Sequence, residues 1–328
     1  MKHSSDRRNF LKKSAAAALA LPVIASLEEY ALLAKEAEPA SAVPAPSSKA
    51  TMPVGTIGDM KISRLICGGN LIGGYAHSRD LIYVSKLLQQ YFTEEKIMET
   101  WAQCEAHGVN TMIFNPSNKR GSMVFAKYRQ QGGKIQFLAQ LDGSKTNMKT
   151  VIKEAVDAGA EGALLVGNLS DKWSREGDMD AIGAFVETVK MEGLIAGVAG
   201  HELRTVMAVE KAGIKPDFYM KTLHDTNYWS TRRPDQMKEV IDNYGIDNYW
   251  CMDPKATIKY MKTLKRPWIA YKVLAAGAIH PRNGFKYAFS NGADFCVAGM
   301  FDFQIAENVV MANDILKATQ TRERTWMA

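Results

Sequence analysis

The sequence predicts an α/β fold, a (β/α)8 TIM barrel that begins with a short N-terminal β-hairpin. Three observations predict it: eight short apolar runs recur after residue 51, helical patterns lie between them, and glycines follow several of the helices. An open doubly wound sheet is the alternative, and that fold places a GxGxxG phosphate loop after its first strand. Gly68-Gly69-Asn70-Leu71-Ile72-Gly73-Gly74 is rich in glycine but lacks this spacing, which favours the barrel.

The folded part opens with the hairpin, which we expect over residues 52–64. Gly58-Asp59 supplies its turn, because Gly and Asp adopt the backbone angles of a tight turn at low cost. The apolar runs that follow have the length and composition of strands buried on both faces of a parallel sheet. The eight strands are expected at residues 64–67, 111–114, 135–139, 162–166, 194–198, 218–223, 268–274 and 295–298.

Between these strands, apolar residues recur at spacings of three and four, which is typical of helices with one buried face. The expected helices include residues 94–107, 149–158, 181–191, 203–212, 234–244 and 254–264. Gly108, Gly159, Gly213 and Gly292 stand where a helix should end and a strand begin. Glycine readily adopts the left-handed conformation that stops a helix, so these four positions support the alternation.

The domain organisation is predicted from composition. We expect a signal peptide over residues 1–25, a disordered linker over residues 26–51 and a single barrel domain over residues 52–328. The linker is rich in Ala, Pro, Ser and Glu and shows no apolar period. The remaining part, roughly 275 residues, is long enough for one large domain with one core.

Residues 4–25 resemble a twin-arginine export signal. Arg7-Arg8 is followed by Phe10-Leu11, and residues 15–24 form an uncharged apolar run. The resemblance implies recognition by the twin-arginine export machinery, transport in the folded state and a periplasmic or exported location. The run is shorter than the roughly 20 residues that span a bilayer, so no stable membrane span is expected. The alternative is the ordinary basic and apolar N-terminus of a cytosolic chain.

Charge and cysteine content exclude several functions. The formal net charge is +6, and because residues 1–25 hold five basic side chains and one acidic one, the rest of the chain carries +2. No basic stripe with interleaved aromatic residues is present, so we expect no nucleic-acid partner. Cys67, Cys104, Cys251 and Cys296 form no CxxC pair and no zinc-site spacing. Cys67 and Cys296 lie in apolar runs, where cysteine acts as a small apolar side chain.

In a barrel of this kind, the loops that follow the strands build the active site. Imidazole, carboxylate and amine groups around one cavity can transfer protons. The residues that we predict as catalytic on this basis are His201, His224, Lys272 and Asp225. Lys272 has apolar neighbours, which would favour a neutral amine that acts as a base or forms a Schiff base. An ion pair with a neighbouring acid is the alternative.

A small-molecule substrate is the expected partner. The residues predicted to bind it are His77, Asn70, Asn115, Gln140, Asn168 and Trp229. Aromatic side chains near the sixth strand suit the C–H faces of a sugar ring, with ordinary loop packing as the alternative. A divalent metal is a further alternative, held by His201, His224, Glu202 and Asp142, although no HxH or HxxxH spacing fixes its geometry.

Three segments resemble the aldo/keto reductase superfamily. Residues 54–69 resemble its opening hairpin and first strand, and Tyr271-Lys272-Val273-Leu274-Ala275-Ala276-Gly277 resembles its seventh strand. Residues 299–309, with Glu307-Asn308, resemble its last strand and cofactor-side helix. The resemblance implies a barrel that binds NADP and reduces a carbonyl group. It also implies four catalytic residues: an Asp, a Tyr proton donor, a Lys that lowers the pKa of the Tyr, and a His.

The chain departs from that superfamily at all four catalytic positions. Asn115 stands in place of the Asp, no Tyr precedes Gly121, Gln140 replaces the Lys, and Gly167 or Asn168 replaces the His. Carbonyl reduction needs an acid to protonate the developing alkoxide, so the superfamily's mechanism cannot run unchanged. Residues 300–304, where the NADP phosphate is expected, lack the Arg and Lys residues that favour a 2′-phosphate.

Three functions stay open. The first is an exported aldo/keto reductase-like oxidoreductase that acts on a small carbonyl or sugar-like compound with the usual catalytic set lost. The second is a non-redox lyase, isomerase or epimerase on sugar-like substrates, with or without a metal. The third is a barrel that binds a ligand without catalysis. The candidate site residues favour the second function, and the resemblance favours the first. A fold alone does not decide function, so the resemblance does not settle the choice.

Overall fold

The computed structural model describes residues 52–77, 81, 83–231 and 250–328. The expected signal peptide, the expected linker and the helix expected over residues 234–244 lie outside these residues. Within the described ranges, none of the helices is both long and apolar enough to cross a membrane.

Eight parallel strands form a closed barrel, as the sequence predicts, in the order β10-β3-β4-β5-β6-β7-β8-β9. The strands are β3 (Leu65–Gly68), β4 (Thr111–Phe114), β5 (Gln136–Leu141), β6 (Gly162–Leu165), β7 (Ile195–Gly200), β8 (Phe218–Thr222), β9 (Trp268–Tyr271) and β10 (Phe295–Ala298). The expected bounds agree with the structure at β4 and β10. The largest difference is at β9, which ends at Tyr271 because Lys272 takes a left-handed conformation with a φ of 58°.

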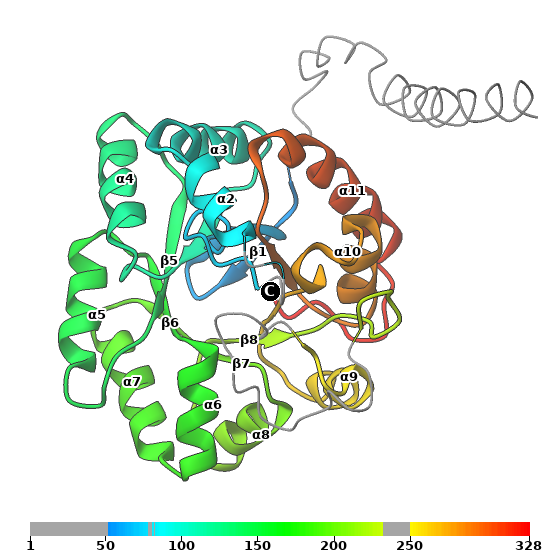
Figure 1. Ribbon diagram of the computed structural model, residues 1–328. Coiled ribbons are helices and arrows are strands. Elements are labelled where there is room, and N and C mark those ends of the chain that lie inside the picture. Colours follow the sequence, from blue (N-terminus) through cyan, green and yellow to red (C-terminus); the bar gives the residue numbers. More distant parts are fainter. Residues whose placement is uncertain (1–51, 78–80, 82, 232–249) are drawn as a thin grey trace, which may run out of the picture. The chain divides into compact units, whose positions relative to one another are not determined.

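Helices surround the barrel (Figure 1). They are α2 (Val84–Tyr91), α3 (Glu94–Ala106), α4 (Lys119–Gln130), α5 (Met148–Asp157), α6 (Gly167–Glu176), α7 (Met179–Met191), α8 (Leu203–Lys211), α9 (Pro254–Met261), α10 (Pro281–Ser290) and α11 (Ile305–Ala318), with short 3₁₀ turns η2 (Ala275–Gly277) and η3 (Asp302–Gln304). Gly108, Gly159, Gly213 and Gly292 all have positive φ, which confirms that they end helices in the left-handed conformation.

The expected hairpin covers the amino-terminal end of the barrel. Strands β1 (Val54–Ile57) and β2 (Met60–Ser63) pair antiparallel around the Gly58 turn. The carbonyl oxygen of Lys61 accepts hydrogen bonds from the side chains of Asn110 and Gln136, at the start of β4 and β5. The apolar side chains of the hairpin pack with the inward-facing side chains of the barrel. The carboxyl end of the barrel is therefore the end at which a ligand can enter.

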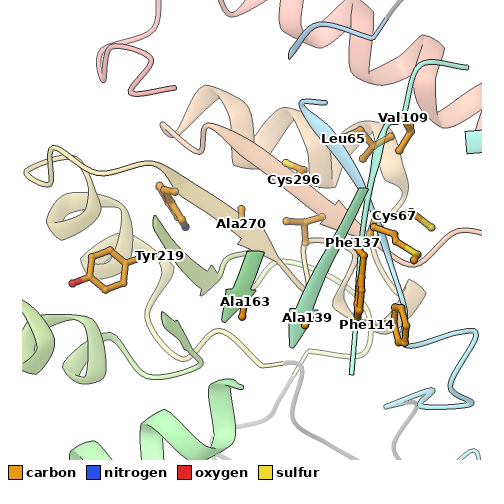
Figure 2. Close-up of a cluster of buried hydrophobic side chains, with 14 of the residues drawn as sticks. Leu65, Cys67, Val109, Phe114, Phe137, Ala139, Ala163, Tyr219, Ala270 and Cys296 are labelled. Carbon is orange, nitrogen blue, oxygen red and sulfur yellow. The ribbon is translucent and has the colours of Figure 1, made fainter. Parts of the chain in front are cut away.

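Two apolar layers hold the barrel together. An inner cluster fills the barrel with inward-facing side chains such as Ile66. An outer cluster lies between strands and helices, where the rings of Phe114 and Phe137 stack with centroids 4.2 Å apart and Cys67 and Cys296 are buried (Figure 2). Burying one Leu or Phe side chain contributes about 1.5–3 kcal/mol. These layers therefore dominate the stability and fix the strand ends that carry the site.

Candidate active site

A polar cavity of about 280 Å³ lies at the carboxyl ends of the strands. Its walls come from residues at or after the ends of β3, β4, β5, β6, β7 and β9, so side chains distant in sequence meet there. The polar side chains that line it are Asn70, Tyr75, His77, Asn115, Ser117, Asn118, Gln140, Asp142, Asn168, His201, Tyr271 and Lys272. The structure thus brings together most of the strand-end residues that the sequence singled out.

A second and larger space, the apolar lobe, adjoins the polar cavity and has a volume of about 540 Å³. The two spaces share the walls formed by Gly69, Asn70, Tyr75, His77, Gln140, Tyr271 and Lys272. Beyond these residues the lobe is mostly apolar, with Leu71, Leu88, Met220, Val273, Ile279 and Phe301 in its walls. Together the two spaces suit a ligand with one polar part and one apolar part.

His201 follows β7 and is held by Asp171, which lies on α6. The Nδ1 atom of His201 is 2.9 Å from Oδ2 of Asp171, and the backbone N–H of His201 donates to the same oxygen. Thr205 donates its hydroxyl to the other carboxylate oxygen at 2.7 Å. The side chains of His201 and Asp171 are only 8% and 1% exposed. Burial and these hydrogen bonds fix the orientation of the imidazole.

The environment sets the charges of this pair. Burial lowers the pKa of His201. Burial alone would raise the pKa of Asp171, but hydrogen bonds from His201 and Thr205 bring it below its usual value. At neutral pH the pair is therefore a neutral imidazole that donates Nδ1–H to a carboxylate. In that tautomer Nε2 carries the lone pair, which is the arrangement of a general base oriented by an acid.

Tyr271, the last residue of β9, approaches His201 inside the barrel mouth. Their ring centroids are 5.5 Å apart. Gly167, the first residue of α6, stands beside both rings: a Cβ atom there would lie 2.7 Å from Oη of Tyr271 and 2.8 Å from Cε1 of His201. Both separations are shorter than a carbon contact tolerates. The missing side chain of Gly167 therefore lets the phenol and the imidazole lie close together.

Backbone strain is concentrated at this site. In the described part of the chain, the residues other than glycine with positive φ are His77, Lys272, Ala275 and Ala276. His77, Lys272 and Ala276 line the apolar lobe, and Ala275 is their neighbour in sequence. This conformation costs about 1–2 kcal/mol for a residue with a Cβ atom. Strain of this kind gathers at functional sites, where the surrounding structure maintains it.

Lys272 combines this strained backbone with a perturbed side chain. It is half-buried at the junction of the polar cavity and the apolar lobe. Burial disfavours the charged form and lowers the pKa of Lys272 to about 7. A pKa near 7 favours the neutral amine at physiological pH, and the role of Lys272 as a base or nucleophile stays a prediction.

His224 is placed differently from His201. Its Nδ1 atom lies 3.1 Å from the carbonyl oxygen of Lys272, and the backbone N–H of Cys251 donates to its Nε2 atom at 3.2 Å. The side chain is buried, and burial lowers the pKa of His224 to about 3. It lines neither the polar cavity nor the apolar lobe. The geometry favours a positioning role at the Lys272 turn over the catalytic role predicted from the sequence.

Asp225 and Trp229 lie on the surface outside the two spaces. Asp225 is exposed and accepts a hydrogen bond from the backbone N–H of Asn227, while Trp229 is 89% exposed. Neither residue lines the polar cavity or the apolar lobe. The structure does not bring them to the site, and their roles stay predictions.

The predicted metal ligands have different partners and surroundings. Glu202 forms ion pairs with Arg175 and Arg204, and Asp142 is exposed. Across the described residues, no group of three or more His, Cys, Asp or Glu side chains is arranged to hold a metal ion. The geometry adds no support to the set of His201, His224, Glu202 and Asp142, which stays a prediction.

The amide side chains of the polar cavity are held in different ways. Asn115 accepts a hydrogen bond from the backbone N–H of Ser117, and Asn118 caps α4 by accepting from that of Gly121. The side-chain oxygen of Asn168 is buried and has no hydrogen-bond partner within the described residues. A buried acceptor without a donor is unfavourable until a ligand supplies one. A water molecule or a ligand hydroxyl would satisfy this atom.

The segment expected to hold an NADP phosphate does not fit that group. Asp302 in η3 accepts a hydrogen bond from the hydroxyl of Tyr91 and pairs with Lys96 at 3.0 Å. Phe301 stacks on Phe92 with ring centroids 5.4 Å apart. The segment thus offers a carboxylate whose cation is already engaged. Like charge would repel a 2′-phosphate, so this segment does not suit NADP.

Sequence reasoning missed Asp171, Thr205 and Tyr271 as members of the site. Asp171 lies inside a helix, where an acidic residue is ordinarily solvent-exposed. No sequence signal marked it, because the burial of its neighbours Ser170 and Trp173 is seen only in the structure. Tyr271 is part of an apolar strand run and is indistinguishable from barrel core in sequence.

Comparisons with known proteins support the fold. No protein-family model and no curated protein matches the chain. Among solved structures, it is similar to two proteins from Pseudomonas aeruginosa that are provisionally described as aldo-keto reductases. The first gives a TM-score of 0.55 at 17% identity and covers 81% of this chain and 97% of its own. The second gives 0.54 at 16% identity and covers 81% and 98%. At these identities the likeness shows the barrel fold alone.

Proposed function

We propose that this protein is an enzyme that transfers a proton next to the carbonyl group of a small, uncharged, polyhydroxylated compound, as an isomerase, epimerase or lyase does. One observation carries the proposal: the Asp171-held imidazole of His201 lies beside Tyr271 and Lys272 in a cavity lined by amide side chains. A base, an acid and hydroxyl-binding groups are the parts that such chemistry requires.

The proposed reaction begins with the substrate bound by the amide groups, its carbonyl turned toward Tyr271 and Lys272. Nε2 of His201 removes the proton from the carbon next to the carbonyl. Asp171 stabilises the imidazolium that forms, while the phenol of Tyr271 and the amine of Lys272 stabilise the negative oxygen. Return of the proton to the other face or to the neighbouring carbon completes the reaction. A positioned base of this kind typically contributes about 10²–10⁴-fold to the rate.

The wall chemistry supports an uncharged substrate. Of the described residues that line the polar cavity and the apolar lobe, Lys272 is the only Lys or Arg. Recognition of a phosphate or carboxylate group commonly uses an Arg fork or several cations. Amide groups instead donate to and accept from hydroxyl groups. We therefore expect unphosphorylated sugars and their derivatives rather than sugar phosphates.

Hydrogen exchange tests this proposal. Wild-type protein incubated in ²H2O with dihydroxyacetone, or with a panel of unphosphorylated aldoses and ketoses, should introduce deuterium next to the carbonyl, which proton NMR detects. His201→Gln should lose the exchange because an amide cannot accept the proton. His107→Gln is the control, since that ring contacts the Gln103 carbonyl at the end of α3. Equal exchange in wild type and His201→Gln would contradict the proposal.

A nicotinamide-linked oxidoreductase is the second candidate. It is favoured by the size of the apolar lobe, which adjoins Tyr271 and Lys272 in a barrel similar in fold to described aldo-keto reductases. Fluorescence titration with NADH and NADPH separates the two candidates. We expect neither cofactor to bind with micromolar affinity, which corresponds to about −8 kcal/mol. Tight, saturable binding of either one would favour the oxidoreductase.

We further propose that the protein acts outside the cytoplasm after export by the twin-arginine route. Arg7-Arg8 and the apolar run behind them support this location. Replacing both arginines by lysine should leave the precursor in the cytoplasm, which cell fractionation and immunoblotting would show. Normal export of that variant would contradict the proposed route.

A further inference from the structure

We propose that Lys272 is a covalent catalyst that forms an imine with the carbonyl carbon of the substrate. This inference rests on the proposed function, because it uses the same cavity and the same class of substrate. It adds a nucleophile to the proton-transfer groups already described. It also restricts the substrate to an aldehyde or ketone whose carbonyl carbon can reach the Nζ atom of Lys272.

The position of Lys272 is the first observation that supports the imine. The residue lines both the polar cavity and the apolar lobe, at the junction between them. Its Nζ atom lies 5.4 Å from the ring centroid of Tyr271, and the phenol of Tyr271 in turn approaches His201. The amine, the phenol and the imidazole thus surround one space. A carbonyl compound bound there would meet a nucleophile and two proton-transfer groups together.

The backbone conformation of Lys272 is the second observation that supports the imine. Its carbonyl oxygen accepts hydrogen bonds from the backbone N–H of Ala275 at 3.0 Å and from Nδ1 of His224 at 3.1 Å. These contacts hold the strained left-handed turn. Glycine would form the same turn without strain. The turn does not require a lysine, so its presence here supports a role for the side chain in the cavity.

Lys221, on the neighbouring strand β8, provides an internal comparison. It is fully buried, unlike the half-buried Lys272, and burial lowers its pKa as well. Its Nζ atom donates to the carbonyl oxygens of His201 at 2.8 Å and Thr222 at 3.0 Å. It lines neither the polar cavity nor the apolar lobe. Lys221 lines instead a separate cavity beside Asp171 and His201, and two carbonyl oxygens engage its amine, whereas Lys272 lines the two spaces in which we propose that a substrate binds.

The covalent step balances without an added oxidant or reductant. The lone pair of Nζ forms a bond to the carbonyl carbon, and a proton passes from nitrogen to oxygen to give a carbinolamine. An acid then protonates the hydroxyl, which leaves as water, and a protonated imine remains. The imine withdraws electrons, so the neighbouring C–H bond breaks, His201 takes the proton and an enamine forms. After reprotonation, water hydrolyses the imine and restores the amine.

Reductive trapping tests the inference. Wild-type protein is mixed at pH 7 with dihydroxyacetone and cyanoborohydride, which reduces an imine to a stable amine, and peptides are analysed by mass spectrometry. The reduced adduct should appear on the peptide that contains Lys272. It should be absent in Lys272→Met and in Lys272→Arg, which keeps a cation but forms no imine under these conditions. Lys221→Met is the matched control and should retain the adduct.

Two results would overturn the inference: labelling spread over surface lysines without preference for Lys272, or labelling of the Lys221 peptide instead. Deuterium exchange separates this inference from the proposed function. If wild type exchanges the substrate proton but traps no adduct, His201 acts on the unmodified carbonyl compound and the imine is wrong. If the adduct forms without exchange, Lys272 is confirmed as a nucleophile and the proton-transfer function fails.

Discussion

The two ends of the barrel are built in opposite ways. At the amino-terminal end, the carboxylate of Asp294 is fully buried and accepts hydrogen bonds from Arg322 at 2.9 Å and Arg324 at 2.7 Å. The backbone N–H groups of Trp268 and Met327 donate to it as well. The charge is thus surrounded by donors, which is the condition under which a buried carboxylate is tolerated.

Arg64 completes this closed end. Its guanidinium donates to the carbonyl oxygens of Asp294 and Ala328 and lies 5.0 Å and 4.4 Å from the ring centroids of Phe295 and Trp326. In Figure 1 the C-terminus accordingly lies near the centre of the ring of strands. The chain end and the hairpin together cover the amino-terminal end of the barrel, where the carboxylate of Asp294 is fully paired, although the buried Nε1 atoms of Trp268 and Trp326 have no hydrogen-bond partner within the described residues.

The carboxyl end shows the reverse condition. It holds the strained backbone of Lys272, an amine whose pKa burial lowers to about 7, and the side-chain oxygen of Asn168, which has no partner among the residues that the structure describes. Each of these features lowers stability in the absence of a ligand. The comparison indicates that the amino-terminal end stabilises the fold while the carboxyl end keeps groups in reactive states, a division typical of this architecture.

The largest effect on stability is expected when the buried charge of Asp294 at the amino-terminal end is removed. Asp294→Ala should lower the free energy of unfolding by about 3–5 kcal/mol, because it leaves Arg322 and Arg324 buried without their carboxylate. Urea unfolding followed by circular dichroism measures this. Glu323→Gln, which removes the exposed partner of Lys262, is the control and should change stability by less than about 1 kcal/mol. Equal effects of the two variants would contradict the role given to Asp294.

At the open end, Asp171→Asn should separate function from stability. The amide can donate to Nδ1 of His201, which reverses the imidazole tautomer and moves the lone pair away from Nε2. We expect deuterium exchange to fall by about 10³-fold or more. The free energy of unfolding should fall by at most about 2 kcal/mol, since the shape and several hydrogen bonds are kept. Full exchange activity in this variant would show that His201 does not act as the base.

Gly167→Ala at the carboxyl end should have a smaller effect, on exchange activity. The added methyl group meets Oη of Tyr271 and Cε1 of His201 and must displace one of them. We expect about a tenfold loss of exchange activity, about 1.4 kcal/mol in the activation free energy, from this displacement. Gly183→Ala on α7 is a matched control, because a Cβ atom there meets nothing nearer than 3.7 Å. A loss in the control equal to that of Gly167→Ala would remove the steric explanation.

The smallest effect is a gain in stability. Lys272→Met should raise the free energy of unfolding by about 1 kcal/mol at pH 7, because it removes an amine that is costly to bury in its charged form. The folded-state pKa of about 7 lies below the usual value of 10.5, so the unfolded chain binds more protons between these values and wild-type stability rises with pH across that window. The advantage of Lys272→Met should therefore be largest below pH 7 and shrink as pH rises. Unfolding curves at several pH values measure it, and a constant difference would contradict the lowered pKa.

Much of the fold could be predicted because its signals are local. Gly108 ends a helix through its own backbone freedom, and β4 follows from a short apolar run between polar residues. The end of β9 could not be predicted in this way. The left-handed turn at Lys272 is held by contacts of its carbonyl with Ala275 and with His224, and the latter is distant in sequence. Local propensity carries no information about such a tertiary contact.

The sequence predicts which site residues lie at the carboxyl ends of the strands, but not how their side chains pair. Parallel strands end at one edge, so Asn115, Gln140 and His201 were expected to gather, and they do. The direction of Asp171 depends on how α6 packs beside β7, which the sequence pattern does not specify. The buried position of His224 depends on Cys251, whose backbone N–H occupies one ring nitrogen. Roles that depend on such pairings need the structure.

The central claim is that His201 and Asp171 act as one proton-transfer unit. The most direct measurement is the deuterium exchange rate of His201→Gln, Asp171→Asn and the double variant, compared with wild type. If the carboxylate acts only through the imidazole, the double variant should exchange no more slowly than His201→Gln alone. A double variant slowed by the product of the two single effects, or a wild-type rate in His201→Gln, would contradict the claim.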